Sequence, residues 1–275
     1  MQVRTSPSAN PHPELASPWP PGYAGAVSLT FDDGRASHLS RVVPILAEYG
    51  LHATFYLNPR GATEQEWRER LEPWVAVQAA GHEIGNHSLS HVCSQAMRDR
   101  RDPRLPALET WTLADVEADV MEAERRLGAV LPAPPGQPRT FCYPCYQEHV
   151  GEGPTRRSYV PVIARRFIAA RGAGEYGDNR PATCDLHYLW SWKVELLDGA
   201  ALVGRAERAA LGYWEILTFH DVGDGGRSRL TNTETDFREL CAFLARHRQR
   251  LWTAPVSVVA QRIAAWRRAV FEAAG

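Results

Sequence analysis

The sequence predicts an α/β fold with a mostly parallel sheet, on two observations. Short apolar, β-prone runs such as Val27–Phe31 alternate along the chain with longer segments of helical periodicity. Alternation of strands and helices of these lengths is typical of a parallel sheet. Polar residues follow directly after several of the runs, as expected where the ends of strands form a site. The 275 residues suffice for one large domain or two small ones.

Seven short segments are expected as strands, because their length and apolar character suit strands buried in a parallel sheet. In chain order they are Val27–Phe31, Ala53–Leu57, Glu83–Gly85, Thr140–Tyr143, Leu189–Val194, Glu215–Phe219 and Leu251–Thr253.

Helices are expected between these strands. They cover Ala36–Tyr49, Glu64–Ala80, Leu113–Leu127, Tyr159–Ala170, Ala200–Leu211, Glu234–His247 and Val256–Trp266. Gly50 and Gly81 close the first two, because glycine readily adopts the left-handed conformation that ends a helix. Thr112 or Thr110 is the expected N-cap of the third, and Gly128 stands just past its expected end.

The composition excludes several classes of partner. A net charge of −1 argues against nucleic acid or an anionic membrane as a partner, since both favour a basic face. No apolar run has the length of a membrane span. Residues 1–24 are expected to be a flexible, proline-rich arm ahead of one catalytic domain over residues 25–275. The arm lacks the apolar segment of a signal peptide, so we expect a cytoplasmic protein, or a secreted one if a presequence has been removed.

The five cysteines are dispersed and odd in number. Such a set is more typical of reduced thiols than of a disulfide framework. Cys142 and Cys145 form a C-x-x-C pair, which is also found in redox and zinc sites. Pro144 lies between them in a strand-to-loop context, which favours small buried thiols instead.

Two adjacent carboxylates, Asp32 and Asp33, end the first expected strand. Like charges this close raise one another's pKa, and a bound cation relieves the repulsion, leaving one acid as a ligand and the other as a base. His87 and His91 are four residues apart, which places them on one face of a helical turn where both can hold one metal ion. Two imidazoles and a carboxylate suit a catalytic zinc or similar divalent ion. His220 follows a later strand, and histidine suits a general acid at neutral pH.

These segments resemble the motifs of the polysaccharide deacetylase family, the NodB-homology domain. The motifs are Thr30-Phe31-Asp32-Asp33-Gly34, His87-Ser88-Leu89-Ser90-His91 and Leu217-Thr218-Phe219-His220-Asp221. The resemblance implies a distorted (β/α) barrel of about seven parallel strands. It also implies Asp33, His87 and His91 as ligands of zinc or another divalent ion, Asp32 as general base and His220 as general acid.

The third motif of the family falls on Thr140–Tyr146, with two departures. Cys142 stands where the family has the arginine that orients the base, and Tyr146 stands where glycine is common. Arg35, Arg171 or Lys193 can replace the arginine, and the sequence does not choose among them. The backbone amide of Cys145 remains the expected oxyanion donor, because that role needs only backbone geometry.

The fourth motif, an Asp and a Trp that support the acid, is not cleanly present. Asp185 and Asp198 are candidates for the Asp, and Trp190 and Trp192 for the Trp, although such tryptophans are more often core residues. Four residues are predicted to contact the substrate. They are Tyr143, Tyr146, Trp192 and Leu217.

The sequence therefore predicts a metal-dependent hydrolase that removes acetyl groups from an N-acetylated carbohydrate, with O-acetyl groups left open. Two alternatives stay open. The altered third motif suits a same-fold hydrolase of a small non-sugar amide or cyclic amide. The missing arginine suits a non-catalytic carbohydrate-binding relative. The intact Asp32, His220 and three expected metal ligands argue against this second alternative. Oligomeric state and the identity of the metal are not predicted.

Overall fold

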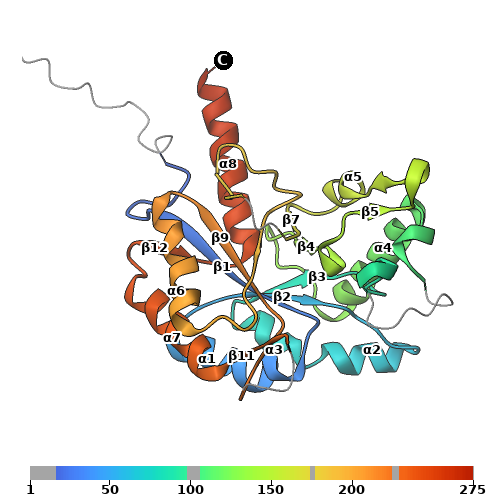
Figure 1. Cartoon of the computed structure of the whole chain (residues 1–275), viewed down its shortest axis with the longest axis horizontal. Helices are drawn as coiled ribbons and strands as arrows, with labels where there is room; N and C mark the ends of the chain where they lie inside the picture. The colour runs from blue at the N-terminus through green and yellow to red at the C-terminus, as the bar shows by residue number, and fades with distance from the viewer. Residues whose placement is uncertain (1–16, 98–105, 174–176, 225–228, 275) are drawn as a thin grey trace, which may run out of the picture.

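The centre of the computed structural model is a curled parallel sheet (Figure 1), and the described residues are 17–97, 106–173, 177–224 and 229–274. The strand order is β7-β4-β3-β2-β1-β9-β8, with β12 paired beside β1. The strands are β1 (Gly25–Asp32), β2 (Thr54–Leu57), β3 (Glu83–Asn86), β4 (Phe141–Cys142), β7 (Ala170–Arg171), β8 (Trp192–Lys193), β9 (Trp214–Phe219) and β12 (Leu251–Thr253). An isolated parallel bridge joins Arg171 to Leu189, ahead of β8, so the sheet curls toward its own far edge. The predicted distorted barrel of parallel strands is confirmed over the described residues.

Helices surround this sheet (Figure 1). They are α1 (Val43–Tyr49), α2 (Glu64–Leu71), α3 (Trp74–Ala79), α4 (Leu113–Val130), α5 (Val160–Ala164), α6 (Gly199–Glu207), α7 (Glu234–Arg246) and α8 (Val256–Ala274). Two small ribbons lie outside the main sheet: β5 (His149–Val150) with β6 (Arg157–Ser158), and β10 (Asp221–Gly223) with β11 (Thr231–Thr233). Over the part of the chain that the structure describes, no helix has both the length and the apolar character needed to cross a membrane.

The strand β1 is buried along its whole length, as a central strand of a parallel sheet must be. Phe31 stacks between Phe55 of β2 and Phe219 of β9, with ring centroids 5.2 Å from each. In the register of the sheet these three residues are direct neighbours. The residues that follow them, Asp32 and His220, therefore emerge at the same edge of the sheet.

Helix ends follow the expected local chemistry in most places. Gly50 is left-handed at the end of α1, and the side chain of Thr112 accepts the backbone N–H of Asp115 at the start of α4. Gly128 lies inside α4 rather than past its end, because the helix continues to Val130. The helix expected over Glu64–Ala80 is two helices, since Pro73 cannot continue the first.

The largest departure from the predicted elements lies around β7. The helix expected over Tyr159–Ala170 is only α5, and Ala170–Arg171 is a strand that pairs with β4. The run Phe167-Ile168-Ala169-Ala170 has good helix formers, but pairing in the sheet overrides that preference. The strand expected over Leu189–Val194 is reduced to β8.

The predicted N-terminal arm lies mostly outside the described residues. Near its end, Trp19 is only 4% exposed and packs in a core cluster with Trp214 and Val256. The indole therefore attaches the start of the described chain to the body of the protein.

Candidate metal-binding and catalytic site

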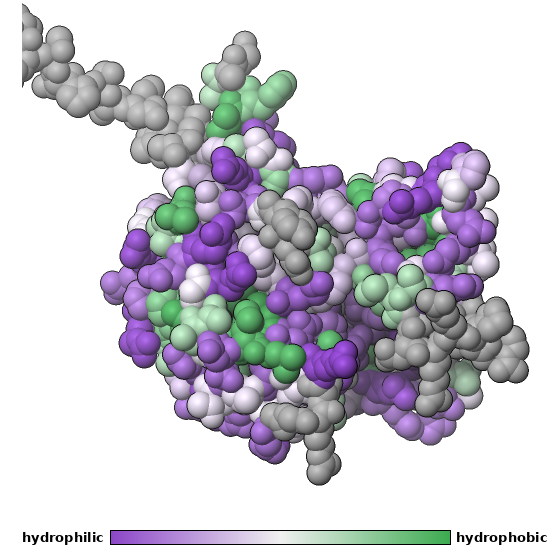
Figure 2. Space-filling view, in the orientation of Figure 1, coloured by the Kyte–Doolittle hydropathy of each residue, from purple (hydrophilic) through white to green (hydrophobic). Residues whose placement is uncertain are grey.

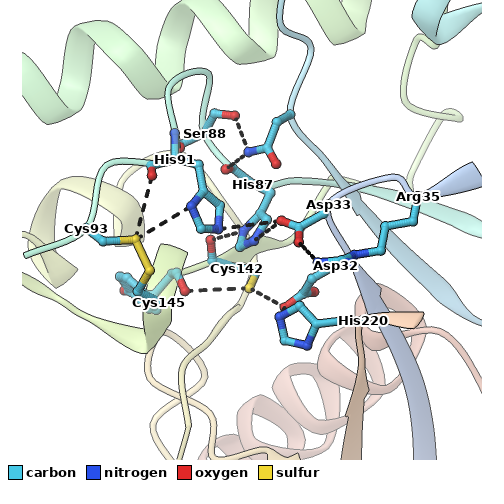
Figure 3. Close-up of polar contacts among 12 residues, drawn as sticks. Asp32, Asp33, Arg35, His87, Ser88, His91, Cys93, Cys142, Cys145 and His220 are labelled. Atoms are coloured by element: carbon cyan, nitrogen blue, oxygen red, sulfur yellow. Dashed lines mark hydrogen bonds and ion pairs between the residues drawn. A yellow bond between two sulfur atoms is a disulfide. The ribbon is translucent and has the colours of Figure 1, made fainter. Parts of the chain in front are cut away.

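Asp33, His87 and His91 meet at the carboxyl edge of the sheet (Figure 3). Oδ1 of Asp33 lies 3.8 Å from Nε2 of His87 and 3.6 Å from Nε2 of His91. One ligand atom from each residue lies within 4.8 Å of the others. A carboxylate from the end of β1 and two imidazoles from the segment after β3 thus converge on one point.

The two histidines come together in a loop and not on a helical turn, which corrects the sequence prediction. Ser88 and His91 both have left-handed backbone, with φ of 62° and 51°. Polar side chains hold this backbone: Asn58 donates to the carbonyls of His87 and Ser88, and Asp119 accepts the backbone N–H of Leu89 at 2.9 Å. A loop of unusual backbone so tightly bonded is typical of a functional site.

The protonation states suit a divalent metal ion. Nδ1 of His87 lies 2.9 Å from the carbonyl oxygen of Cys142, which can only accept, so Nδ1 carries the proton and Nε2 is the free lone pair. Burial lowers the pKa of His87 to about 4 and also lowers that of His91. Burial raises the pKa of Asp33, but His87 and His91 outweigh it and lower the value to about 2. Two neutral imidazoles and one carboxylate fit a zinc-type ion.

Asp32 is buried and forms an ion pair with the fully buried Arg171 of β7. Of the three cations considered from the sequence, Arg35 instead bonds Asp33 at 3.1 Å, and Lys193 lines the nearby cavity. The thiol of Cys142 lies 3.6 Å from the other oxygen of Asp32. Burial raises the pKa of Asp32, but Arg171 first and then the nearby imidazoles lower it, and the net shift is downward.

His220 faces Asp32 from the end of β9. Its Nε2 lies 4.0 Å from Oδ2 of Asp32, and its Nδ1 is hydrogen-bonded to Glu195 at 2.7 Å. Burial lowers the pKa of His220, whereas Glu195 and Asp32 raise it, and the net shift is upward. Glu195 therefore makes the contact with His220 that was expected of the fourth-motif Asp.

Sequence reasoning missed Glu195, although a usable signal was present. It directly follows the strand expected over Leu189–Val194, the same strand-end position that singled out Asp32. The two residues considered instead lie elsewhere: Asp198 caps α6 by accepting the N–H of Ala201, and the exposed Asp185 accepts the N–H of His187.

A disulfide joins Cys93 and Cys145, which corrects the expectation of reduced, separate thiols. Cys142 and Cys145 are therefore not paired with each other, and Cys142 is a buried free thiol. Spacing along the chain did not reveal the bond, because the loop after β3 and the turn after β4 meet only in the folded sheet. Sγ of Cys93 lies 3.6 Å from Nδ1 of His91, so the disulfide lies directly beside the candidate metal ligands (Figure 3).

A cavity of about 870 Å³ opens over these residues. Its walls include Tyr143, Cys145 and Tyr146 from the segment after β4, and Cys145 and Tyr146 have left-handed backbone. The remaining lining residues are Asp32, Asp33, His87, His91, Met97, Lys193, Glu195, His220, Arg229 and Leu230. The sequence also has long polar connections over residues 93–111, 147–158, 172–186 and 222–233, and all of these except 147–158 extend partly outside the described residues.

Two of the predicted substrate-binding residues do not line the cavity. Leu217 is fully buried in the core against β1. The indole N–H of Trp192 donates to Glu215, and the guanidinium of Arg205 lies over its ring. Side chains within a strand point to the faces of the sheet, so Trp192 and Leu217 contact packed neighbours and not the cavity beyond the strand ends.

The sequence similarity to a known family lies in the first part of the chain. Residues 21–148 match the sequence profile of the polysaccharide deacetylase family. The resemblance to that family is thus confirmed over residues 21–148.

Two curated deacetylases also align with part of this chain. A chitin deacetylase of a Pestalotiopsis species is 29% identical over 122 residues, 43% of this chain and 33% of the relative. A chitooligosaccharide deacetylase of Sinorhizobium fredii is 32% identical over 110 residues, 40% of this chain and 42% of the relative. The chain thus spans less than half the length of these relatives.

The likeness to solved structures covers nearly the whole chain. A crystal structure from Mycobacterium smegmatis, named only provisionally as a polysaccharide deacetylase, superposes with a TM-score of 0.60. The match covers 90% of this chain and 92% of that one, at 18% identity. At this identity the comparison supports the same fold.

Proposed function

We propose that this chain is a metal-dependent hydrolase that removes acetyl groups from an N-acetylated carbohydrate. The observation that carries the proposal is the convergence of Asp33, His87 and His91 beside the Asp32–Arg171 ion pair and across from His220. The relatives named as chitin and chitooligosaccharide deacetylases support an acetylated sugar as the substrate.

Asp33, His87 and His91 would hold the ion, zinc or another divalent transition metal. When bound, such an ion polarises an acyl carbonyl and lowers the pKa of water beside it. His87 is held for this task by its bond to the carbonyl of Cys142, and His91 by the turn in which its N–H donates to the hydroxyl of Ser88 at 3.0 Å.

Asp32 is the general base that takes a proton from the attacking water. Its lowered pKa keeps the carboxylate ionised near neutral pH, as a base must be. Arg171 is a positioning residue, because it binds one carboxylate oxygen and leaves the other directed toward His220.

His220 is the general acid that protonates the departing amine. The bond from Nδ1–H to Glu195 leaves Nε2–H of the imidazolium as the proton to be donated, and the raised pKa of His220 keeps that proton in place near neutral pH. Water thus gives a hydroxyl to the acyl carbon, the C–N bond breaks, and acetate and an amine leave.

The backbone N–H of Cys145 is our candidate donor to the oxyanion that forms on the acyl oxygen. The cavity lining and left-handed backbone of Cys145 support this assignment. Tyr143 and Tyr146 are the candidate sugar contacts. Tyr143 is among the lining residues of the cavity, but it is fully buried and its ring packs against Phe141, Tyr159 and Tyr188. Its hydroxyl donates to the carbonyl of His187 at 2.7 Å, so Tyr146 is the better placed of the two.

The Cys93–Cys145 disulfide also bears on where the protein works. Stable disulfides persist in oxidising compartments and are rare in the cytoplasm. We therefore favour an oxidising compartment over the cytoplasm expected from the sequence.

A hydrolase of a small non-sugar amide is the second candidate, favoured by Tyr146. Its ring fills part of the cavity wall where the resemblance predicts a glycine. The test is acetate or ring-opened product released from acetylated sugar oligomers, small amides and cyclic amides, with and without a chelator and after zinc is restored. Acetate from sugars that stops on chelation supports the proposal. Turnover of amides alone would establish the second candidate, and activity untouched by metal removal would contradict both.

A further inference from the structure

A second set of possible metal ligands lies beside the proposed catalytic centre. One ligand atom from each of His91, Cys93 and Cys145 lies within 4.8 Å of the others. Figure 3 shows the imidazole of His91 between Cys93 on one side and Asp33 on the other. Its Nδ1 lies 3.6 Å from Sγ of Cys93, and its Nε2 lies 3.6 Å from Oδ1 of Asp33. The same histidine therefore belongs to both sets of ligands.

The two sets compete for His91. A neutral imidazole has a single lone pair, because one of its two ring nitrogens carries the proton. When Nε2 binds an ion together with Asp33 and His87, the proton is on Nδ1. When Nδ1 binds an ion together with the two cysteines, the proton is on Nε2. Only one of the two sets can therefore be complete at any time.

The two cysteines are held near each other by contacts that do not depend on their disulfide. The side chain of Gln147 accepts the backbone N–H of Ser94 and donates to the hydroxyl of Ser94, each at 2.8 Å. Ser94 follows Cys93 directly, and Gln147 comes shortly after Cys145. The Cα atoms of the two cysteines are 5.8 Å apart. We therefore expect the two thiols and Nδ1 of His91 to face one point when the disulfide is reduced.

The chemistry of this second set favours zinc. Thiolate sulfur and imidazole nitrogen are the ligands of zinc in closed structural sites, and soft thiolates select zinc over harder ions. The catalytic set instead offers a carboxylate and two imidazoles. Zinc should therefore prefer the cysteine-containing set whenever both thiols are free. Cys145 also lines the cavity, so an ion or a small oxidant reaches its sulfur from the cavity.

We propose that His91, Cys93 and Cys145 form a zinc site in the reduced protein, and that formation of the disulfide returns His91 to the catalytic set. In that step an organic disulfide exchanges with the two protein thiolates. The Cys93–Cys145 bond forms, the organic disulfide leaves as two thiolates, and the zinc ion is released. The reduced protein is then an inactive zinc-binding form. The effect on activity rests on the proposed deacetylase function, whereas the site itself does not.

The test of the site uses cobalt(II) in place of zinc. Bonds from cobalt to thiolate sulfur give an intense ultraviolet charge-transfer absorption, which carboxylate and imidazole ligands do not give. Metal-free protein is titrated with cobalt in its disulfide form and after reduction by a phosphine, which adds no competing thiol. We expect a single ion bound in each form, with the absorption only after reduction, and oxidised glutathione should remove it. Near-ultraviolet circular dichroism reports whether the reduced protein is folded.

Variants assign the absorption to its ligands. Cys93→Ser should abolish it, and His91→Ala should weaken cobalt binding by the reduced protein at least about tenfold, because one of three ligands is lost. Cys142→Ser is the matched control, since Cys142 is a buried free thiol close to Asp32, and the absorption should persist in it. The inference is overturned if the folded reduced protein shows no absorption, if Cys93→Ser keeps it, or if Cys142→Ser loses it. An absorption that appears only in unfolded protein, or two ions bound at once, also overturns it.

Activity provides a second measurement, with zinc in place of cobalt. Reduction should lower the rate of acetate release at least about tenfold, because the catalytic set keeps only two of its three ligands. Protein with both Cys93 and Cys145 replaced by serine should have the same rate with and without the phosphine. If no form of the native protein releases acetate, the proposed function fails, and the cobalt absorption still decides on the site. A reduced native protein as active as the disulfide form contradicts the transfer of His91.

Discussion

The guanidinium of Arg171, in the short strand β7, forms an ion pair with the carboxylate of Asp32 at the end of β1. Both side chains are almost fully buried, and 139 residues separate them in the sequence. The resemblance predicts an arginine at position 142, where this chain has a cysteine. Strand β7 pairs with β4 and aligns Arg171 with Cys142, so the positive charge comes from the neighbouring strand.

The first prediction concerns this ion pair. Arg171→Gln should lower kcat for acetate release by about 10²-fold or more, because the base loses the group that orients it. Losing one member of a buried ion pair is also costly to folding, by about 3–5 kcal/mol. Thermal melting therefore accompanies the kinetics, and the loss is judged on protein that remains folded.

A rescue variant distinguishes orientation of Asp32 from a general structural role. The thiol of Cys142 already contacts Asp32 at 3.6 Å, so Cys142→Arg together with Arg171→Gln restores a cation from the position that the resemblance predicts. Recovery of a large part of kcat supports the positioning role. If the double variant is as stable as Cys142→Ser but no more active than Arg171→Gln, the ion pair does not orient the base.

Much of the fold and half of the site were predictable because they depend on local signals. Strand-end carboxylates and paired histidines locate Asp32, Asp33, His87 and His91 in the sequence, and the sheet brings them together. Arg171 could be offered only as one of three cations, because its strand has just two residues and reads as the end of a helix. A strand this short is defined by its neighbours and not by its own composition.

The second prediction concerns the metal ligands. His91→Ala or Asp33→Ala should abolish stoichiometric zinc binding and acetate release together, since each removes one of the three proposed protein ligands. Zinc content is measured by elemental analysis after dialysis. The control is His52→Gln, an exposed histidine ahead of β2 at the opposite edge of the sheet. Full zinc occupancy in the His91→Ala protein would rule out the assigned ligands.

The third prediction concerns the pH dependence of activity. In the proposed mechanism His220 acts while protonated, and Glu195 helps to raise the pKa of its imidazolium. Glu195→Gln removes that charge and lowers the pKa of His220, so the alkaline fall of kcat should begin at lower pH. The pH profile of kcat is compared with that of Glu207→Gln, an exposed acid at the end of α6. A profile that keeps its alkaline limb in Glu195→Gln would show that His220 is not the acid.

The fourth prediction concerns the disulfide between Cys93 and Cys145, which ties the segment after His91 to the turn that carries the candidate oxyanion donor. Native protein should contain three free thiols on titration after denaturation, from Cys142, Cys184 and Cys241. Replacing both Cys93 and Cys145 by serine should lower the free energy of unfolding by about 2–4 kcal/mol, because the bond closes a long loop in the unfolded chain.

The same change should weaken zinc binding several-fold, since His91 loses the restraint two residues away. The control variant Cys184→Ser should change neither zinc binding nor the free energy of unfolding. Zinc affinity and stability equal to those of Cys184→Ser would mean that the bond restrains neither the metal ligands nor the fold.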